Sequence, residues 1–128
     1  MDIQSINNNL SQANIDIPGM FPHLDYLRSA PYIFSIHFGL EELPIEPGIL
    51  IIRGARQYGK STWLERMLYK TVREFGAGSA FYLNGEYLLD VDQLEYEILN
   101  LLPFFSQKSV VRRIFIDEIT AIPEWKLL

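Results

Sequence analysis

The sequence lacks cysteine and is poor in histidine. None of its 128 residues is a cysteine, so disulfide bonds and thiolate metal sites are excluded. The absence of cysteine also fits a reducing compartment. The two histidines, His23 and His37, lie in different segments without metal-ligand spacing around them. We therefore expect no zinc site.

A basic balance and long apolar runs are also missing. Acidic residues outnumber basic residues 16 to 11, which gives a formal net charge of -5. Nucleic-acid binding by this segment is therefore not expected, because phosphate backbones need a basic surface. No apolar run reaches the length of a membrane span, and the polar, acidic N-terminal residues do not resemble a secretory signal. These features predict a cytoplasmic protein without a membrane partner.

The composition is that of a globular domain, with 48% hydrophobic and 21% charged residues. Residues 1–20 are rich in Asn, Gln and Ser, and we interpret them as a leader or linker, either disordered or a short packed arm. Residues 21–128 are interpreted as one domain. A short helix before Pro31, with Leu24 and Leu27 on its apolar face, and a strand over 32–43 are expected to open it.

The rest of the chain alternates between strand and helix patterns. Strands are expected at 49–53, 79–89 and 109–117, and helices at 61–75 and 90–102. We expect Gly76 and Gly78 to end the first helix and Pro103 to end the second. Asp92 is expected to cap the second helix, with Glu95 completing a capping box. This order predicts a mainly parallel sheet with right-handed crossovers, covered by helices.

Residues 54–61 read GARQYGKS, which fits the phosphate-binding pattern G-x-x-x-x-G-K-[ST] between a strand and a helix. Inward-facing backbone amides can form an anion nest, and the helix N-terminus adds its positive dipole end. The alternative is a glycine-rich turn that only caps the helix. We predict that a nucleotide contacts Gly54, Ala55, Arg56, Gln57, Tyr58, Gly59, Lys60, Ser61 and Thr62.

The side chains of this loop have separable roles. Lys60 is expected to reach the β- and γ-phosphates, and the Thr62 hydroxyl to contact the α-phosphate region. The Ser61 hydroxyl suits a magnesium ion. A second motif, IFIDE, ends in Asp117, which we expect to hold Mg²⁺ through water, and in Glu118, a general base for an attacking water. The alternative is that both acids only cap a following helix.

The segments ILIIRGARQYGKST and RRIFIDEITAIPEW together resemble the AAA-type P-loop ATPases of bacteria and archaea. The resemblance covers about residues 30 to 128. It implies an α/β fold, the three-layer sandwich of P-loop NTPases with a mainly parallel sheet. The positions that match this group beyond a generic phosphate loop are Arg56, Gln57, Ile119, Pro123 and Trp125.

The resemblance implies further features. Such ATPases often carry a polar residue at the end of the second strand, where Asn84 stands, so Asn84 is either an orienting residue or the Asn of a turn before Gly85. They also continue with a sensing strand and a C-terminal module. We therefore expect an incomplete domain, unless an early strand or a second chain fills the sheet. The expected partner is either a missing C-terminal domain or another protein, with a homo-oligomer as a further option.

Several functions fit this reading. The leading hypothesis is binding of ATP with Mg²⁺ and, in the complete protein, hydrolysis that drives conformational work or regulation, with Lys60 and Glu118 as the catalytic residues. A second is a nucleotide-dependent interaction switch with little turnover. A third is a non-hydrolysing fragment that keeps the motif as a relic. A small-molecule kinase is disfavoured, because Glu118 beside Asp117 prepares water as the acceptor.

Overall fold

The computed structural model describes residues 1–29, 43 and 59–127. The strands predicted at 32–43 (apart from Leu43) and at 49–53 therefore lie outside the described residues, as do positions 54–58 of the predicted phosphate loop.

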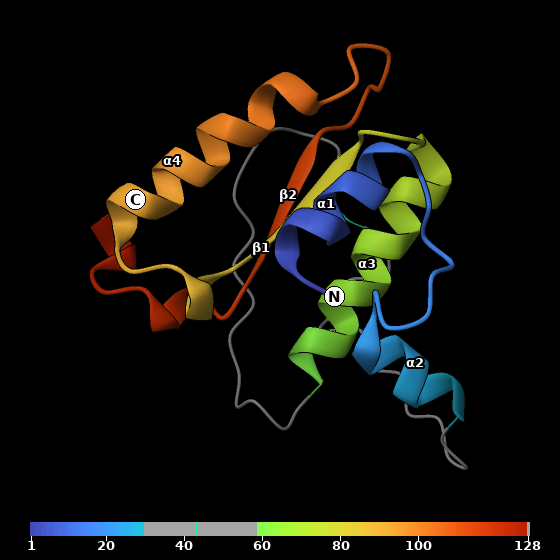
Figure 1. Cartoon of the computed structure of the whole chain (residues 1–128), viewed down its shortest axis with the longest axis horizontal. Coiled ribbons are helices and arrows are strands. Elements are labelled where there is room, and N and C mark those ends of the chain that lie inside the picture. The colour runs from blue at the N-terminus through green and yellow to red at the C-terminus, as the bar shows by residue number, and fades with distance from the viewer. Residues whose placement is uncertain (30–42, 44–58, 128) are drawn as a thin grey trace.

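Figure 1 shows the arrangement of the described elements. The helices are α1 (Ile3–Ser11), α2 (Pro22–Ser29), α3 (Lys60–Phe75) and α4 (Val91–Leu101), and the strands are β1 (Ala80–Asn84) and β2 (Arg113–Asp117). Short 3₁₀ turns are η2 (Gly85–Tyr87), η3 (Leu102–Phe104), η4 (Ile119–Ala121) and η5 (Trp125–Leu127).

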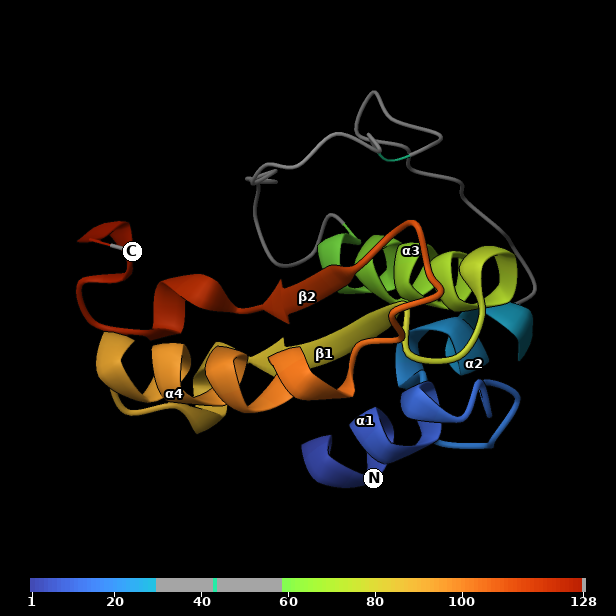
Figure 2. The same cartoon turned by 90° about the horizontal axis from the view of Figure 1, so that it is seen from above.

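The two described strands form a parallel pair joined by α4 as the crossover. The register places Ala80 opposite Arg113 and Asn84 opposite Asp117, so both strands end at the same edge. Seen from above, α3 and α4 lie on opposite sides of the strands, with α1 beside β1 (Figure 2). The parallel α/β arrangement predicted for this region is confirmed in this part of the sheet.

Both strands are shorter than predicted. β1 ends at Asn84 instead of continuing to residue 89, because the Asn84 side chain accepts a hydrogen bond from Glu86 N at 2.9 Å and turns the chain. β2 begins at Arg113 instead of residue 109. There the Ser109 hydroxyl donates to Val111 O at 2.6 Å and accepts from Val111 N, which holds this stretch in a turn.

The helical periodicity of residues 61–75 predicts α3 well. The helix ends at Phe75, and Gly76 follows with a φ of 91°, a value that favours glycine. The side chains of α3 that face the sheet are packed with Phe115 of β2 and with α1 and α2 in one core cluster. The buried hydrophobic residues of α3 are Trp63, Met67, Leu68 and Val72.

α4 begins two residues earlier than the predicted cap implies. Asp90 is the N-cap, and its carboxylate accepts from Gln93 N at 2.9 Å. The prediction of Asp92 with Glu95 as a capping box is wrong, because Asp90 is the extended residue before the first turn and Asp92 already lies within that turn.

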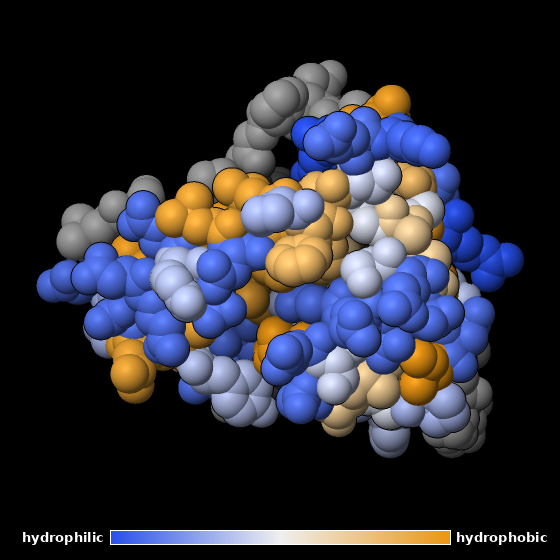
Figure 3. Space-filling view, turned by 45° about the horizontal axis from the view of Figure 1, so that its top comes forward, coloured by the Kyte–Doolittle hydropathy of each residue, from blue (hydrophilic) through white to orange (hydrophobic). Residues whose placement is uncertain are grey.

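Leu94 is buried against the sheet. On the outer side, hydrophobic side chains gather over the C-terminal half of α4 and η3 (Figure 3).

The first residues form a packed helix. The carboxylate of Asp2 caps α1 by accepting from Ser5 N at 2.7 Å, and Ile6 and Leu10 are buried in the core. Of the two alternatives for this segment, the structure has the packed arm. Asn7 bonds to the backbone of Tyr82: its Nδ2 donates to Tyr82 O at 2.8 Å, and Tyr82 N donates to its Oδ1 at 2.7 Å. The side-chain amide thereby occupies the edge of β1 that faces away from β2.

Over residues 1–29 and 59–127, no helix combines the length and hydrophobicity of a membrane span.

Candidate functional site

A cleft of about 1070 Å³ lies where the two strands end. Of the predicted site residues, five line it together: Lys60, Ser61, Asn84, Asp117 and Glu118. Gly59 and Thr62 are described but are not among its lining residues, and Gly54 to Tyr58 lie outside the described residues. Ligand pockets commonly measure roughly 300–1,000 Å³, so this cleft has room for a nucleotide.

The N-terminus of α3 forms one wall. Gly59 is the residue before the helix, with a φ of 78°, and it offers no side chain to cap the first amides. The first helical residues, Lys60 and Ser61, add an ammonium and a hydroxyl to the cleft. A helix N-terminus with a lysine in its first turn is suited to an anion, because its N–H groups and dipole favour negative charge.

The strand ends form the opposite wall. Asp117 is the last residue of β2, and its Oδ1 accepts a hydrogen bond from Glu118 N at 2.9 Å. Glu118 has left-handed backbone angles, φ 53° and ψ 42°, and it precedes η4 without a side-chain cap hydrogen bond to it. The Glu118 side chain therefore makes no cap bond to η4, whereas the Asp117 side chain bonds the amide that precedes it. The oxygen donors of Asp117 and Ser61 fit the ligand preference of Mg²⁺.

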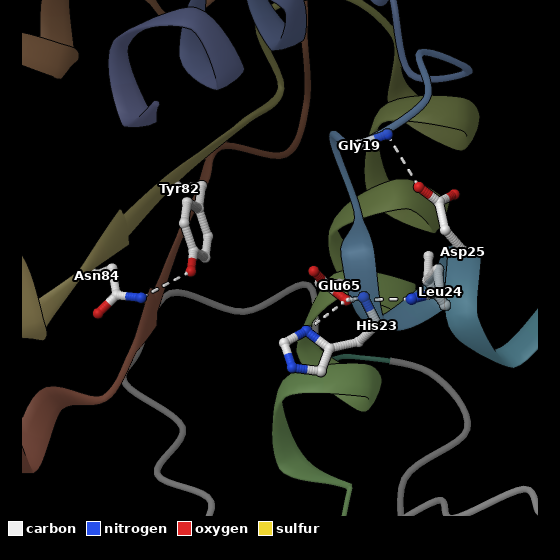
Figure 4. A network of polar contacts seen from close by, with 7 residues as sticks. All are labelled: Gly19, His23, Leu24, Asp25, Glu65, Tyr82 and Asn84. Atoms are coloured by element: carbon white, nitrogen blue, oxygen red, sulfur yellow. Dashed lines mark hydrogen bonds and ion pairs between the residues drawn. The ribbon is translucent and has the colours of Figure 1, made fainter. Parts of the chain in front are cut away.

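Asn84 makes the hydrogen bond of the turn interpretation, and its orienting role stays a prediction. Its Oδ1 accepts from Glu86 N, which is the turn interpretation, while its Nδ2 donates to the Tyr82 hydroxyl at 3.2 Å (Figure 4). In the parallel register Asn84 lies opposite Asp117. An amide is thus placed beside the carboxylate at the sheet edge, where the predicted orienting residue would stand.

Sequence reasoning missed Tyr82. Its side chain lines the cleft two residues before Asn84 and therefore lies on the same strand face. Burial, followed by the negative charge of Asp117, raises the pKa of Tyr82 to about 12. The phenol therefore keeps its proton further into the alkaline range than an ordinary tyrosine does. The two-residue spacing from Asn84 is the signal that could have identified it.

Glu65 and His23 were also missed. The Glu65 carboxylate is buried in α3 and accepts from His23 N at 2.9 Å and Leu24 N at 3.3 Å, which ties α3 to the start of α2 (Figure 4). His23 Nδ1 lies 3.1 Å from Glu65 Oε2. Burial raises the pKa of Glu65, and the contacts with His23 oppose that rise. Glu65 stands four residues after Ser61, so helical spacing alone places both on one face.

A family model described as an AAA domain matches residues 46–128. This range includes both the phosphate-loop pattern and the acidic strand end. No curated protein and no solved structure matches the chain.

Proposed function

Because the chain belongs to the AAA domain family, we propose that the cleft binds ATP together with Mg²⁺ and supports hydrolysis of the β–γ phosphoanhydride bond. Family membership supports nucleotide binding, and the residues of the cleft support the finer assignment. The observation that carries it is the convergence on one cleft of Lys60 and Ser61 from the start of α3 with Asp117 and Glu118 from the end of β2.

Each residue has a role in this proposal. The N-terminus of α3 and the Lys60 ammonium bind the β- and γ-phosphates by charge and by backbone donation. The Ser61 hydroxyl and the Asp117 carboxylate would hold Mg²⁺. The predicted loop residues Gly54 to Gly59 surround the phosphates, and Thr62 contacts the α-phosphate region. Bound Mg²⁺ would supply neutralisation of the phosphate charge.

Glu118 acts as the general base. It accepts a proton from a water molecule whose oxygen forms a bond to the γ-phosphorus, while the bond from that phosphorus to the bridging oxygen breaks. The products are ADP and inorganic phosphate. The Asn84 amide, held by the Tyr82 hydroxyl, orients groups around this water. Positioning and charge neutralisation provide most of the rate enhancement.

Two substitutions test the proposal. In wild type, MgATP at 100 times its Kd is expected to stabilise the fold by about 2.7 kcal/mol, which corresponds to a rise in Tm on the order of 10 °C for a domain of this size. Lys60→Ala should lose most of this rise, whereas Lys108→Ala, on an exposed loop residue, should keep it. Differential scanning fluorimetry with and without Mg²⁺ measures both. If well-folded wild type shows no rise in Tm with MgATP, nucleotide binding is contradicted. That result would favour the hypothesis of a non-hydrolysing fragment that keeps the motif as a relic.

Glu118→Gln separates hydrolysis from binding. It should retain the MgATP-induced rise in Tm and lower phosphate release by about 10²- to 10⁴-fold, the usual contribution of a general base. Glu124→Gln, an exposed neighbour outside the cleft, should leave release unchanged. If Glu118→Gln releases phosphate like wild type, Glu118 is not the base. If wild type binds ATP but turns over little, the interaction switch is favoured.

The remaining sequence predictions stay predictions. They are the boundary near residue 20, the cytoplasmic location, a C-terminal or protein partner, and a homo-oligomer. The tests above bear on the nucleotide alone.

A further inference from the structure

Two turns pack against each other beside the cleft. η2 follows β1, η4 follows β2, and the two are in contact. The register that pairs Asn84 with Asp117 brings the next residues, Gly85 and Glu118, face to face. A Cβ on Gly85 would overlap the carbonyl oxygen of Glu118, and it would lie 3.0 Å from the carbonyl carbon and 3.1 Å from Ile122 Cγ1. Position 85 therefore has no room for a side chain.

Glycine is needed at position 85 because there is no room for a Cβ, and not because of the backbone conformation. Gly85 is not among the residues with positive φ, so its backbone angles alone do not require glycine. The unusual conformation belongs instead to Glu118, with its φ of 53°. The surrounding contacts must hold a non-glycine residue in that region, since it is unfavourable for a residue with a side chain.

Two hydrogen bonds and the packing of two neighbouring residues hold the Glu118 backbone. Its N–H donates to Asp117 Oδ1 at 2.9 Å, and its carbonyl oxygen accepts from Ala121 N at 3.1 Å. The buried side chain of Ile122 and the bare face of Gly85 close the turn around that carbonyl. A methyl group at position 85 would displace the carbonyl and disturb its bond to Ala121. The backbone of residue 118 would then leave its present angles.

We propose that Gly85 is a positioning residue: by packing against the Glu118 carbonyl, it fixes the backbone that aims the Glu118 carboxylate into the cleft. This inference rests on the role proposed above for Glu118. Lys60 and Ser61, which are proposed to seat the nucleotide, lie on α3 and not on this turn. The contact therefore acts on turnover more than on nucleotide affinity, although Asp117 Oδ1 also bonds to the N–H of Glu118.

Gly85→Ala tests this inference, with Gly76→Ala as the matched control. Gly76 has a φ of 91° with nothing within 4 Å of an added Cβ, so this control strains the backbone away from the cleft. Gly85→Ala should lower kcat about 10- to 100-fold, as expected for a misplaced catalytic group. The Kd for MgATP, measured by calorimetry, should change by a smaller factor than kcat does. Gly76→Ala should change neither. Equal kcat in wild type and Gly85→Ala would overturn the proposal.

A double variant distinguishes positioning from general damage. If Gly85 acts through Glu118, Gly85→Ala combined with Glu118→Gln should be no slower than Glu118→Gln alone, because residues that act as a unit are not additive. Multiplicative losses would overturn the proposal. If wild type binds no MgATP, or Glu118→Gln turns over normally, the proposed function fails instead.

Hydrogen exchange tests the contact without any turnover. The amides of residues 118–122 should exchange faster in Gly85→Ala than in wild type, and at the wild-type rate in Gly76→Ala. The milder Ile122→Val loosens the same turn from its other side, so it should also speed exchange of these amides. This variant replaces Gly85→Ala in the test if Gly85→Ala does not fold. Unchanged exchange in both variants would overturn the proposal.

Discussion

Tyr82 shows how one side chain takes its properties from the parts of the fold around it. Its backbone bonds to Asn7 of α1, its hydroxyl accepts from Asn84, and its ring lies among buried residues of the core. Asp117 and Glu65 both act on it electrostatically, and each disfavours the phenolate. Burial adds to that effect, so Tyr82 should lose its proton later than an ordinary tyrosine.

This produces a testable dependence on pH. The pKa of Tyr82 is raised from 10.0 to about 12 in the folded protein, so its contribution to the free energy of unfolding is complete below pH 10. That contribution falls as the pH rises from 10 to 12, where the unfolded chain has lost a proton that the folded chain still holds. Absorbance at 295 nm should show a late phenolate step that Tyr82→Phe removes. The exposed Tyr96→Phe should keep that step, and its loss there would contradict the assignment.

At the residue scale, pattern and spacing identified one group of site residues and missed another. The residues found from the sequence belong to contiguous motifs, which a pattern can identify. They are Lys60, Ser61, Asp117 and Glu118. Tyr82, Glu65 and His23 carry no motif. Their place in the cleft comes from tertiary packing of α2 and β1 against α3, which local sequence does not encode.

At the element scale, Asn7 links α1 to the sheet. Its amide donates to and accepts from the same backbone residue of β1, as a neighbouring strand would. Asn7→Ala should therefore destabilise the fold by roughly 1–3 kcal/mol, because the Tyr82 N–H loses its partner in a half-buried place. Asn8→Ala, exposed on the same helix, should change the free energy of unfolding by less than about 0.5 kcal/mol. Urea unfolding compares them, and equal losses would contradict the edge role.

Elements were predicted unevenly, for physical reasons. α3 has apolar residues at helical spacing over four turns, and its prediction is confirmed. α1 was obscured because only Ile6 and Leu10 among its residues are buried, leaving a largely polar composition. The end of β1 was overestimated because the apolar residues after Asn84 continue a strand-like pattern. The hydrogen bond from Glu86 N to the Asn84 side chain ends the strand despite that pattern.

At the scale of the whole molecule, one core cluster joins α1, α2 and α3 to both strands. Leu10 is fully buried in it, and its carbonyl accepts from Gly78 N at 3.2 Å, at the turn before β1. A fold held by a shared core should unfold as one unit, although its first helix lies far along the chain from its strands.

Leu10→Ala tests whether the fold unfolds cooperatively as one unit. Removing a fully buried leucine side chain is expected to lower the free energy of unfolding by about 2–5 kcal/mol, a large part of the total for a small domain. Leu99→Ala, at a residue of α4 that is 55% exposed, should cost less than about 1 kcal/mol. Circular dichroism and tryptophan fluorescence should give one midpoint in urea. Separate midpoints would show that α1 melts independently of the sheet.

The first four residues of the chain, Met1 to Gln4, contribute to the wall of the cleft. A purification tag fused ahead of Met1 would therefore emerge at the mouth of the site, where it could obstruct entry or offer its own histidines to the added metal. Affinities are best measured on protein with a free amino terminus, and a label or immobilisation handle belongs on an exposed residue such as Lys108.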